Sequence, residues 1–305
     1  MLKRICAAAA LLLVIQSGAV AQTMRFTTNV GSFDMVLNPT NDPNLQPLVD
    51  NIVAYIGLGR YHFSAVNRAA DSGPGTADDF VLQMGGFMGF PTVPDLWARL
   101  NTPVEALTPV TVDDDGDGQV DFGALSNTRG TVSLALQAGN PNSGTSSFFV
   151  NLGSNDFLDS QGFVPFARID NMATIDEILL LMQTDLTDEI GQSGNLAFSD
   201  VPLTDKGRLV VVQDVEVIQA DDDFSFVGPI ANALQLASRG SASSSALMSS
   251  PPSSEGSMAA LLADEPPPSE TAAFTATAVP EPSTVALGLL GIFASLMAAR
   301  RGKKS

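Results

Sequence analysis

The chain has almost none of the residues on which thiol and imidazole chemistry depend. Its 305 residues include one cysteine, Cys6, and one histidine, His62. Cys6 lies in an N-terminal segment that we expect to be removed, so the mature protein can form neither a disulfide nor a thiolate metal site. We expect His62, the sole histidine, to be an exposed loop residue, and we therefore exclude nucleophilic triads of the Ser–His or Cys–His type as well.

Basic residues are also scarce. The sequence has 15 Lys and Arg against 33 Asp and Glu, which gives a formal net charge of −18. Six of the 15 basic residues stand at positions 3, 4, 300, 301, 303 and 304, so nine remain for the rest of the chain. A surface this acidic repels polyanions, and we therefore exclude nucleic acid as a direct partner.

The first 21 residues have the layout of a secretory signal peptide. Lys3 and Arg4 precede an apolar run that ends at Ile15, and Ala19-Val20-Ala21 is a typical cleavage site. A membrane anchor is the alternative, but the apolar run is short for a bilayer. We predict a signal peptide over residues 1–21 and hence an exported protein.

The C-terminus carries a second targeting signal, over residues 279–305. Pro280-Glu281-Pro282 is followed by an apolar run, Val285–Ala299, and then by four basic residues. This order of parts resembles the PEP-CTERM sorting signal, which implies an exosortase as the partner that removes the tail. The alternative is a plain membrane anchor, with a transmembrane segment over residues 285–299. Both interpretations place the body of the protein in the periplasm, on the cell surface or in the extracellular matrix.

Residues 221–278 are rich in Ser, Pro, Ala and Glu and include the stretches SASSSALMSSPPSSEGS and DEPPPSE. Such a composition buries too little apolar surface to offset the loss of chain entropy on folding, so we predict a disordered linker. The remaining residues, 23–220, are the size of one domain.

Within this domain the hydrophobic pattern predicts many strands and two helices. A hairpin is expected over Met24–Thr28 and Gly31–Leu37, because apolar and polar residues alternate on both sides of a short turn. The helices are expected over Leu45–Leu58 and Met172–Met182. Further strands are expected over residues 64–69, 80–85, 130–136, 146–152, 162–169 and 209–219. This content is typical of a mainly β fold, a closed or nearly closed antiparallel barrel capped by helices.

Several motifs stand in a specific order between Met24 and Ala220. They are VDNIVAYIGLGRY, SAVNRAA, FVLQMGGF, SNTRGTVSLA, PNSGTSSFFVNL, FLD and FVPFARI. In this order they resemble the cyclophilins, a family of peptidyl-prolyl cis-trans isomerases. The resemblance implies a cyclophilin-like eight-stranded antiparallel β-barrel capped by two α-helices, a monomer that needs no cofactor and acts on proline-containing polypeptides.

The resemblance also implies the site residues. Arg68 in NRAA matches the catalytic arginine of the family, which donates a hydrogen bond to the imide nitrogen of proline. Gln83 in FVLQ matches the glutamine that holds the carbonyl group before proline. The other matched positions are expected to contact the substrate. They are the pocket residues Phe80, Val81, Phe149 and Leu158, the rim residue Phe157, Phe163 in place of a pocket histidine of some members, and the strand residues Ala135 and Leu136 along which the peptide lies.

Some positions depart from the family pattern. Ser147 stands where the family has a glutamine that grips the peptide, and Met84 stands in place of a glycine, where its side chain could crowd the sheet. Phe157 replaces a tryptophan that favours cyclosporin binding in eukaryotic members, which implies weak sensitivity to cyclosporin. The alternative function is therefore a proline-peptide binding or matrix protein that retains the barrel but has weak or no turnover, with or without stabilisation by calcium.

An acidic loop lies outside the family pattern. Asp113, Asp115, Asp117 and Asp121 occupy positions 1, 3, 5 and 9 of a calcium-loop spacing, and Gly118 occupies position 6. Ala124 stands at position 12, where such loops have an acidic residue. The loop is either a structural calcium site, as in a calcium-dependent adhesion module, or a solvated acidic turn.

Overall fold

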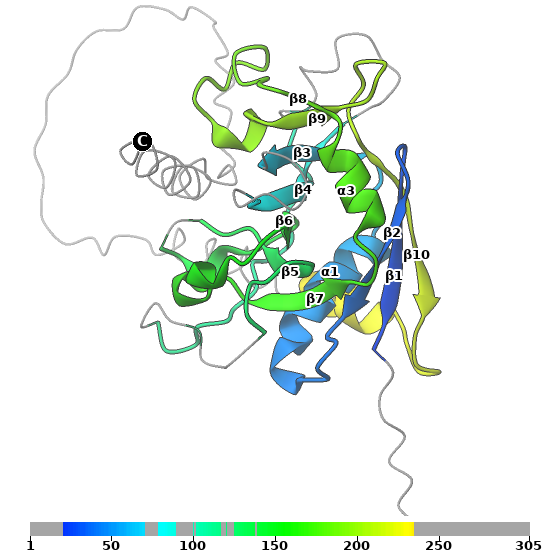
Figure 1. Cartoon of the computed structure of the whole chain (residues 1–305). Helices are drawn as coiled ribbons and strands as arrows, with labels where there is room; N and C mark the ends of the chain where they lie inside the picture. The colour runs from blue at the N-terminus through cyan, green and yellow to red at the C-terminus, as the bar shows by residue number, and fades with distance from the viewer. Residues whose placement is uncertain are drawn as a thin grey trace, which may run out of the picture.

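The computed structural model describes residues 21–70, 79–89, 100, 102–116, 120, 125–137 and 139–234. Its first elements are β1 (Thr23–Thr28) and β2 (Ser32–Leu37), which pair as an antiparallel hairpin. Phe26, Phe33 and Met35 are buried, whereas their neighbours Thr27 and Asp34 are partly exposed. The alternation that predicted the hairpin therefore places one face of each strand in the core. Figure 1 shows β1 and β2 side by side, with β10 on the other side of β1.

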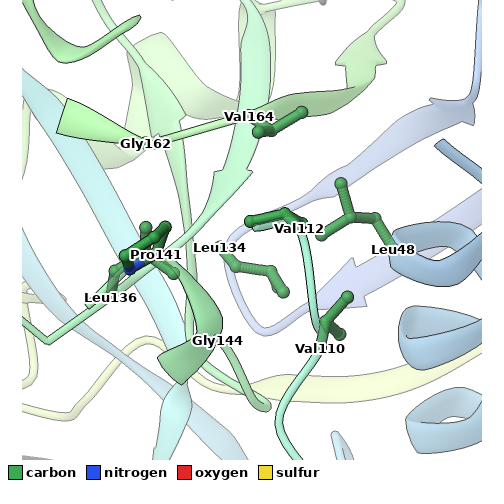
Figure 2. Close-up of a pocket in the computed structure, with 9 residues that line it drawn as sticks. All are labelled: Leu48, Val110, Val112, Leu134, Leu136, Pro141, Gly144, Gly162 and Val164. Atoms are coloured by element: carbon green, nitrogen blue, oxygen red, sulfur yellow. The ribbon is translucent and has the colours of Figure 1, made fainter. Parts of the chain in front are cut away.

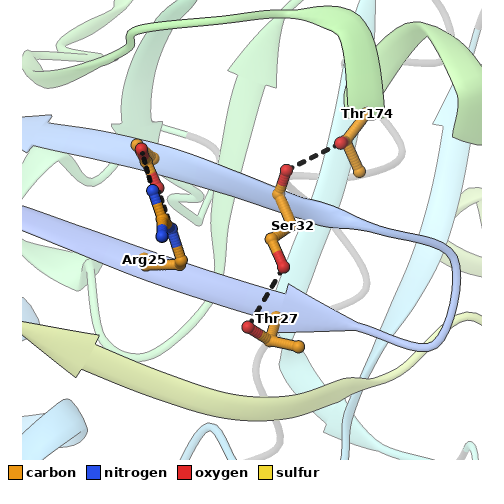
Figure 3. A network of polar contacts seen from close by, with 5 residues as sticks. Arg25, Thr27, Ser32 and Thr174 are labelled. Carbon is orange, nitrogen blue, oxygen red and sulfur yellow. Dashed lines mark hydrogen bonds and ion pairs between the residues drawn. The ribbon is translucent and has the colours of Figure 1, made fainter. Parts of the chain in front are cut away.

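Polar contacts fix the outer face of this hairpin (Figure 3). Nε and Nη2 of Arg25 each donate to one carboxylate oxygen of Asp34 at 2.8 Å, a bidentate cross-strand pair. Helix α3 (Ala173–Leu179) is tied to the same hairpin, since Oγ1 of Thr174 donates to the carbonyl oxygen of Ser32 at 2.7 Å. The second predicted helix thus lies beside the first two strands.

Helix α1 (Gln46–Gly57) follows a short 3-10 turn, η1 (Pro43–Leu45), and confirms the first predicted helix. Its apolar residues are buried, among them Ile52 and Tyr55. The backbone N–H of Leu107 donates to the Tyr55 hydroxyl at 2.6 Å, and burial raises the pKa of Tyr55 to about 12. The helix ends at Gly57, and Gly59 then turns the chain with a φ of +67°.

The main sheet has eight strands in the order β10-β1-β2-β7-β5-β6-β4-β3, and the paired strands are antiparallel. It curls until its edge strands meet: the backbone N–H of Phe63 donates to Val212 and that of Val66 donates to Val210. The predicted mainly β class is confirmed. The remaining strands are β3 (Ser64–Ala70), β4 (Val81–Met88), β5 (Thr131–Leu134), β6 (Phe148–Asn151), β7 (Pro165–Ile169) and β10 (Val212–Gln219).

A small unit that we call the side lobe, residues 182–203, lies between α3 and the closing strand. It contains β8 (Met182–Thr184), η4 (Leu196–Phe198) and β9 (Val201–Leu203), and β8 pairs with β9. A second buried cluster joins Phe198 and Val201 of the lobe to Ala65 of β3 and Phe87 of β4. The lobe therefore packs against β3 and β4, the strands that carry the predicted catalytic residues Arg68 and Gln83.

The structure corrects several predicted boundaries. The second helix ends at Leu179 instead of Met182, because β8 begins at Met182. The closing strand begins at Val212 instead of Leu209.

The ordered chain also continues past Ala220. Residues 227–234 are helical, and Phe226 and Ile230 pack against the core at Gly57, although we predicted a linker from residue 221. The rest of that linker, residues 235–278, and both targeting segments up to residue 20 and from residue 279 lie outside the described residues.

Candidate functional site

The two predicted catalytic residues lie side by side. Arg68 on β3 is directly opposite Gln83 on β4, and Gln83 is opposite Phe149 on β6. All three are buried. Side chains of directly opposed residues lie on the same face of a sheet, so these residues form one row across three strands. We call Arg68, Gln83 and Phe149 the site row.

A β-bulge at Asn67 places Arg68 in this row. Val66 pairs with Met84, whereas Arg68 pairs with Gln83, so two steps along β3 correspond to one step along β4. Strict alternation would put Arg68 on the same face as Val66. The bulge moves Arg68 to the opposite face. Asn67 is itself fixed, because its Nδ2 donates to the carbonyl oxygen of Ala197 at 2.9 Å.

The other face of the same strands belongs to the core. Val66, Met84 and Phe148 are opposed in register, and all three are buried. Phe148 contacts Phe26 and Tyr61, with ring centroids 5.8 and 5.6 Å apart. The Met84 side chain is therefore accommodated in the core, away from the site row.

Arg68 is a buried cation with few partners. Its side chain is 4% exposed, and Nε and Nη1 have no hydrogen-bond partner among the described residues. The nearest carboxylate oxygen is Oδ2 of Asp200, 3.6 Å from Nε, and Cζ lies 6.0 Å from the centre of the Phe80 ring. Burial lowers the pKa of Arg68, and the charge of Asp200 opposes that shift. The guanidinium stays protonated and presents unused donors.

The side chain of Gln83 is hydrogen-bonded to Ser147, one of the residues at which this chain departs from the family pattern. Nε2 of Gln83 donates to Oγ of Ser147 at 3.0 Å. Ser147 is half-buried and directly precedes β6. The short serine side chain thus orients the Gln83 amide, and it leaves more open space beside the site row than a glutamine would.

Aromatic and aliphatic residues surround the site row. Phe163 contacts Phe149 edge-on at 5.6 Å between ring centroids, and Phe157 stacks on Phe80 at 6.1 Å. Leu158 is fully buried, whereas Phe157 is only partly buried. Val81 belongs to the same buried cluster, and it lies on the face of β4 that carries Gln83. The structure therefore brings together the predicted pocket residues.

A buried polar network, which the sequence reasoning missed, holds these residues in place. Phe157 and Leu158 lie on η3 (Asp156–Gln161), and Phe163 follows it. Asn127 donates through Nδ2 to Oδ1 of Asp159 at 2.7 Å and to the carbonyl oxygen of Phe163 at 2.8 Å. Its Oδ1 accepts hydrogen bonds from Ser133 and Asn151. The only sequence signal for this network is the pair of asparagines next to strands, in SNTRG and FFVN.

Comparison of the sequence with known proteins identifies the family of the chain. A family model described as "Cyclophilin type peptidyl-prolyl cis-trans isomerase/CLD" matches residues 23–193, more than half of the chain. The chain belongs to the cyclophilin-type peptidyl-prolyl cis-trans isomerases, a family of enzymes. The match includes the site row, but it ends before Asp200 in the side lobe and before β10.

Relatives of this cyclophilin include bacterial peptidyl-prolyl cis-trans isomerases. It is 28% identical over 172 residues to a peptidyl-prolyl cis-trans isomerase of Acinetobacter baylyi, an alignment that covers 54% of this chain and 77% of the relative. It is also 28% identical over 198 residues to peptidyl-prolyl cis-trans isomerase A of Dickeya dadantii, covering 63% and 83%. A crystal structure of a cyclophilin-type isomerase of Cryptosporidium parvum is similar at 15% identity with a TM-score of 0.40, covering 66% of this chain and 99% of that one.

The C-terminal prediction is confirmed by a second match. The PEP-CTERM protein-sorting motif matches residues 278–303 and indicates an exported, sorted protein. None of the helices in the described part of the chain is long and apolar enough to cross a membrane. The predicted transmembrane segment, residues 285–299, lies outside that part.

The strand residues predicted to run along the peptide have a mixed placement. The backbone N–H of Ala135 donates to the carbonyl oxygen of Ser147 at 2.8 Å, which places Ala135 next to the site row. Leu136 instead lines a separate apolar pocket with Leu134 and Pro141 (Figure 2). The volume of this pocket is about 10 Å³, which is barely enough for one water molecule. Leu136 could therefore meet a peptide through its backbone, not through its side chain.

Only part of the acidic loop is described. Asp113 is buried, and its Oδ1 accepts a hydrogen bond from the backbone N–H of Gly116 at 2.7 Å. Asp117 and Asp121 lie outside the described residues. Within the part of the chain that is described, no three His, Cys, Asp or Glu side chains are grouped closely enough to hold a metal ion. The calcium site stays a prediction. His62 is exposed, as expected.

Proposed function

We propose that this cyclophilin is an exported isomerase of X–Pro bonds in extracytoplasmic proteins. The observation that carries the proposal is the site row: a buried guanidinium with unused donors, a buried carboxamide and an aromatic ring lie in register on three adjacent strands. We assign the donor role to Arg68, the carbonyl anchor to Gln83 and the floor of the proline pocket to Phe149.

The reaction requires no covalent step. Rotation about an X–Pro bond has a barrier of roughly 18–20 kcal/mol because amide resonance is lost in the twisted state. In that state the proline nitrogen becomes pyramidal and can accept a hydrogen bond. A donor from Arg68 meets the nitrogen only then, so it lowers the barrier instead of merely strengthening ground-state binding. Burial of Arg68 strengthens this interaction, because less water screens the charge.

The other residues hold the substrate for that rotation. The Gln83 amide, oriented by Ser147, donates to the carbonyl group before proline. The proline ring packs against Phe149, Phe80 and Leu158, and the partly buried Phe157 forms the rim. The protein thus holds the proline ring on one side of the X–Pro bond and the preceding carbonyl group on the other, which orients the substrate for rotation about that bond.

A proline-peptide binder without turnover is the second candidate. Ser147 favours it, since Ser147 cannot reach a bound peptide as a glutamine can. Exchange NMR on a short proline peptide separates the two functions. We expect wild-type protein to broaden the cis and trans signals by catalysed exchange and Arg68→Lys to bind the peptide with much weaker exchange. Peptide binding with no catalysed exchange in the wild type would contradict the isomerase and support the binder.

The substrate class follows from export, because an exported isomerase meets only polypeptides outside the cytoplasm. The sorting motif places the chain among exported proteins, and we propose that an exosortase removes the tail. The substrates are then proline-containing chains that fold outside the cytoplasm. Uncatalysed isomerisation takes tens to hundreds of seconds, slow enough to limit the folding of such chains.

A further inference from the structure

Arg68 has a carboxylate neighbour that comes from outside the segment matching the family. Asp200 lies in the side lobe, seven positions after the family match ends at residue 193. Its Oδ2 is 3.6 Å from Nε of Arg68. Among the described residues this is the only carboxylate paired with Arg68, whose side chain is 4% exposed, whereas that of Asp200 is 38% exposed.

The side lobe fixes Asp200 at this place. The backbone N–H of Ala69, the residue after Arg68, donates to the carbonyl oxygen of Asp200 at 2.7 Å. The hydroxyl of Ser199 lies 2.6 Å from Oδ2 and donates to it, which orients the carboxylate. Phe198 anchors the turn, with its ring 4.7 Å from that of Phe87.

We propose that Asp200 is the positioning residue for the Arg68 guanidinium. The guanidinium is planar and its five N–H groups have fixed directions, so attraction of the Nε edge to Asp200 sets the direction of the Nη groups. Nε and Nη1 are buried and have no hydrogen-bond partner among the described residues, so the guanidinium keeps N–H donors that no protein group uses. A buried cation without any counter-charge would instead turn toward solvent. The catalytic consequence rests on the proposed isomerase function.

The test compares Asp200→Asn with Asp200→Glu and with Asp205→Asn, which makes the same charge change at an exposed position. We expect Asp200→Asn to lower kcat about tenfold with KM changed less than twofold, and Asp200→Glu to recover part of the loss. Asp205→Asn should keep wild-type values. In an Arg68→Lys background, Asp200→Asn should change kcat less than twofold, because the residue it positions is absent.

A spectroscopic measurement tests the contact without any reference to turnover. The ¹H–¹⁵Nε signal of Arg68, identified by its loss in Arg68→Lys, should shift in Asp200→Asn and stay in place in Asp205→Asn. An unmoved signal overturns the proposal. So does an unchanged kcat in active protein, or a loss of kcat that is equal in the wild-type and Arg68→Lys backgrounds. If wild-type protein is inactive, the proposed function fails, while the Nε signal still decides whether Asp200 holds the guanidinium.

Discussion

Arg68 faces Gln83 across two antiparallel strands only because a bulge at Asn67 shifts the register of β3 by one residue. The same bulged segment binds the side lobe through the Asn67 amide. Catalytic geometry and the attachment of the side lobe therefore depend on the same few residues of β3.

The first prediction concerns Ser147. Replacing it with glutamine restores a side chain that can reach the peptide, and the half-buried position leaves room for it to extend outward. We expect Ser147→Gln to raise kcat/KM by about 2- to 10-fold, the contribution of one hydrogen bond. Ser147→Ala, which removes the hydroxyl that accepts a hydrogen bond from Gln83, should lower kcat/KM. A Ser147→Gln variant no faster than wild type would show that Ser147 does not limit turnover.

The second prediction concerns the polar network under the pocket. Asn127 is fully buried and makes hydrogen bonds to Asp159, Phe163, Ser133 and Asn151. Asn127→Ala leaves several of these groups without partners, so we expect the free energy of unfolding to fall by about 3 kcal/mol. Denaturant unfolding measures this change. Asn44→Ala, at an exposed position, is the control, and an equal effect in both variants would refute the role of the network.

Much of the fold was predictable from local pattern. Alternation predicted β1 and β2, and the apolar stripe with its terminal glycines predicted α1. Phe149 was expected in the pocket, and the register of β6 places it opposite Gln83, on the other face of the sheet from the core residue Phe148. In these elements, the side-chain period of the strand or helix determines whether a residue faces the core.

The rest depends on contacts between distant segments. Nothing in the sequence around Asp200 indicates that it meets Arg68, since 132 positions separate them and the lobe packs through scattered apolar residues. The bulge at Asn67 was hidden for the same reason: its register is set by β4. The helix over residues 227–234 begins a segment rich in Ser, Pro, Ala and Glu, and Phe226 and Ile230 are partly buried there through contacts with the distant Gly57.

This docked helix gives the third prediction. A chain that ends at residue 220 loses the contacts of Phe226 and Ile230 with the core, so we expect its free energy of unfolding to be about 2–4 kcal/mol lower than that of a chain ending at residue 240. Phe226→Ala should reproduce part of the loss. Val227→Ala, whose side chain is 74% exposed, should not. Identical melting temperatures for the two chains would show that residues 221–240 do not stabilise the domain, which would support the predicted boundary at residue 220.

The fourth prediction concerns the acidic loop. A calcium site with a dissociation constant near 1 mM stabilises the folded protein by about 1.4 kcal/mol at 10 mM calcium. For a domain of this size we expect the melting temperature to rise by about 3–5 °C. Asp115→Asn should weaken the response, and magnesium at the same concentration controls for ionic strength. A melting temperature that does not respond to calcium identifies the loop as a solvated acidic turn.

The central claim, that Arg68 catalyses X–Pro isomerisation, is tested most directly by a protease-coupled assay on the purified chain with a proline peptide. Removal of a transition-state donor typically costs about 2.7–4 kcal/mol, so we predict that Arg68→Ala lowers kcat/KM about 100- to 1,000-fold while the protein stays folded. Equal rates for wild type and Arg68→Ala, whether both active or both inactive, would contradict the account.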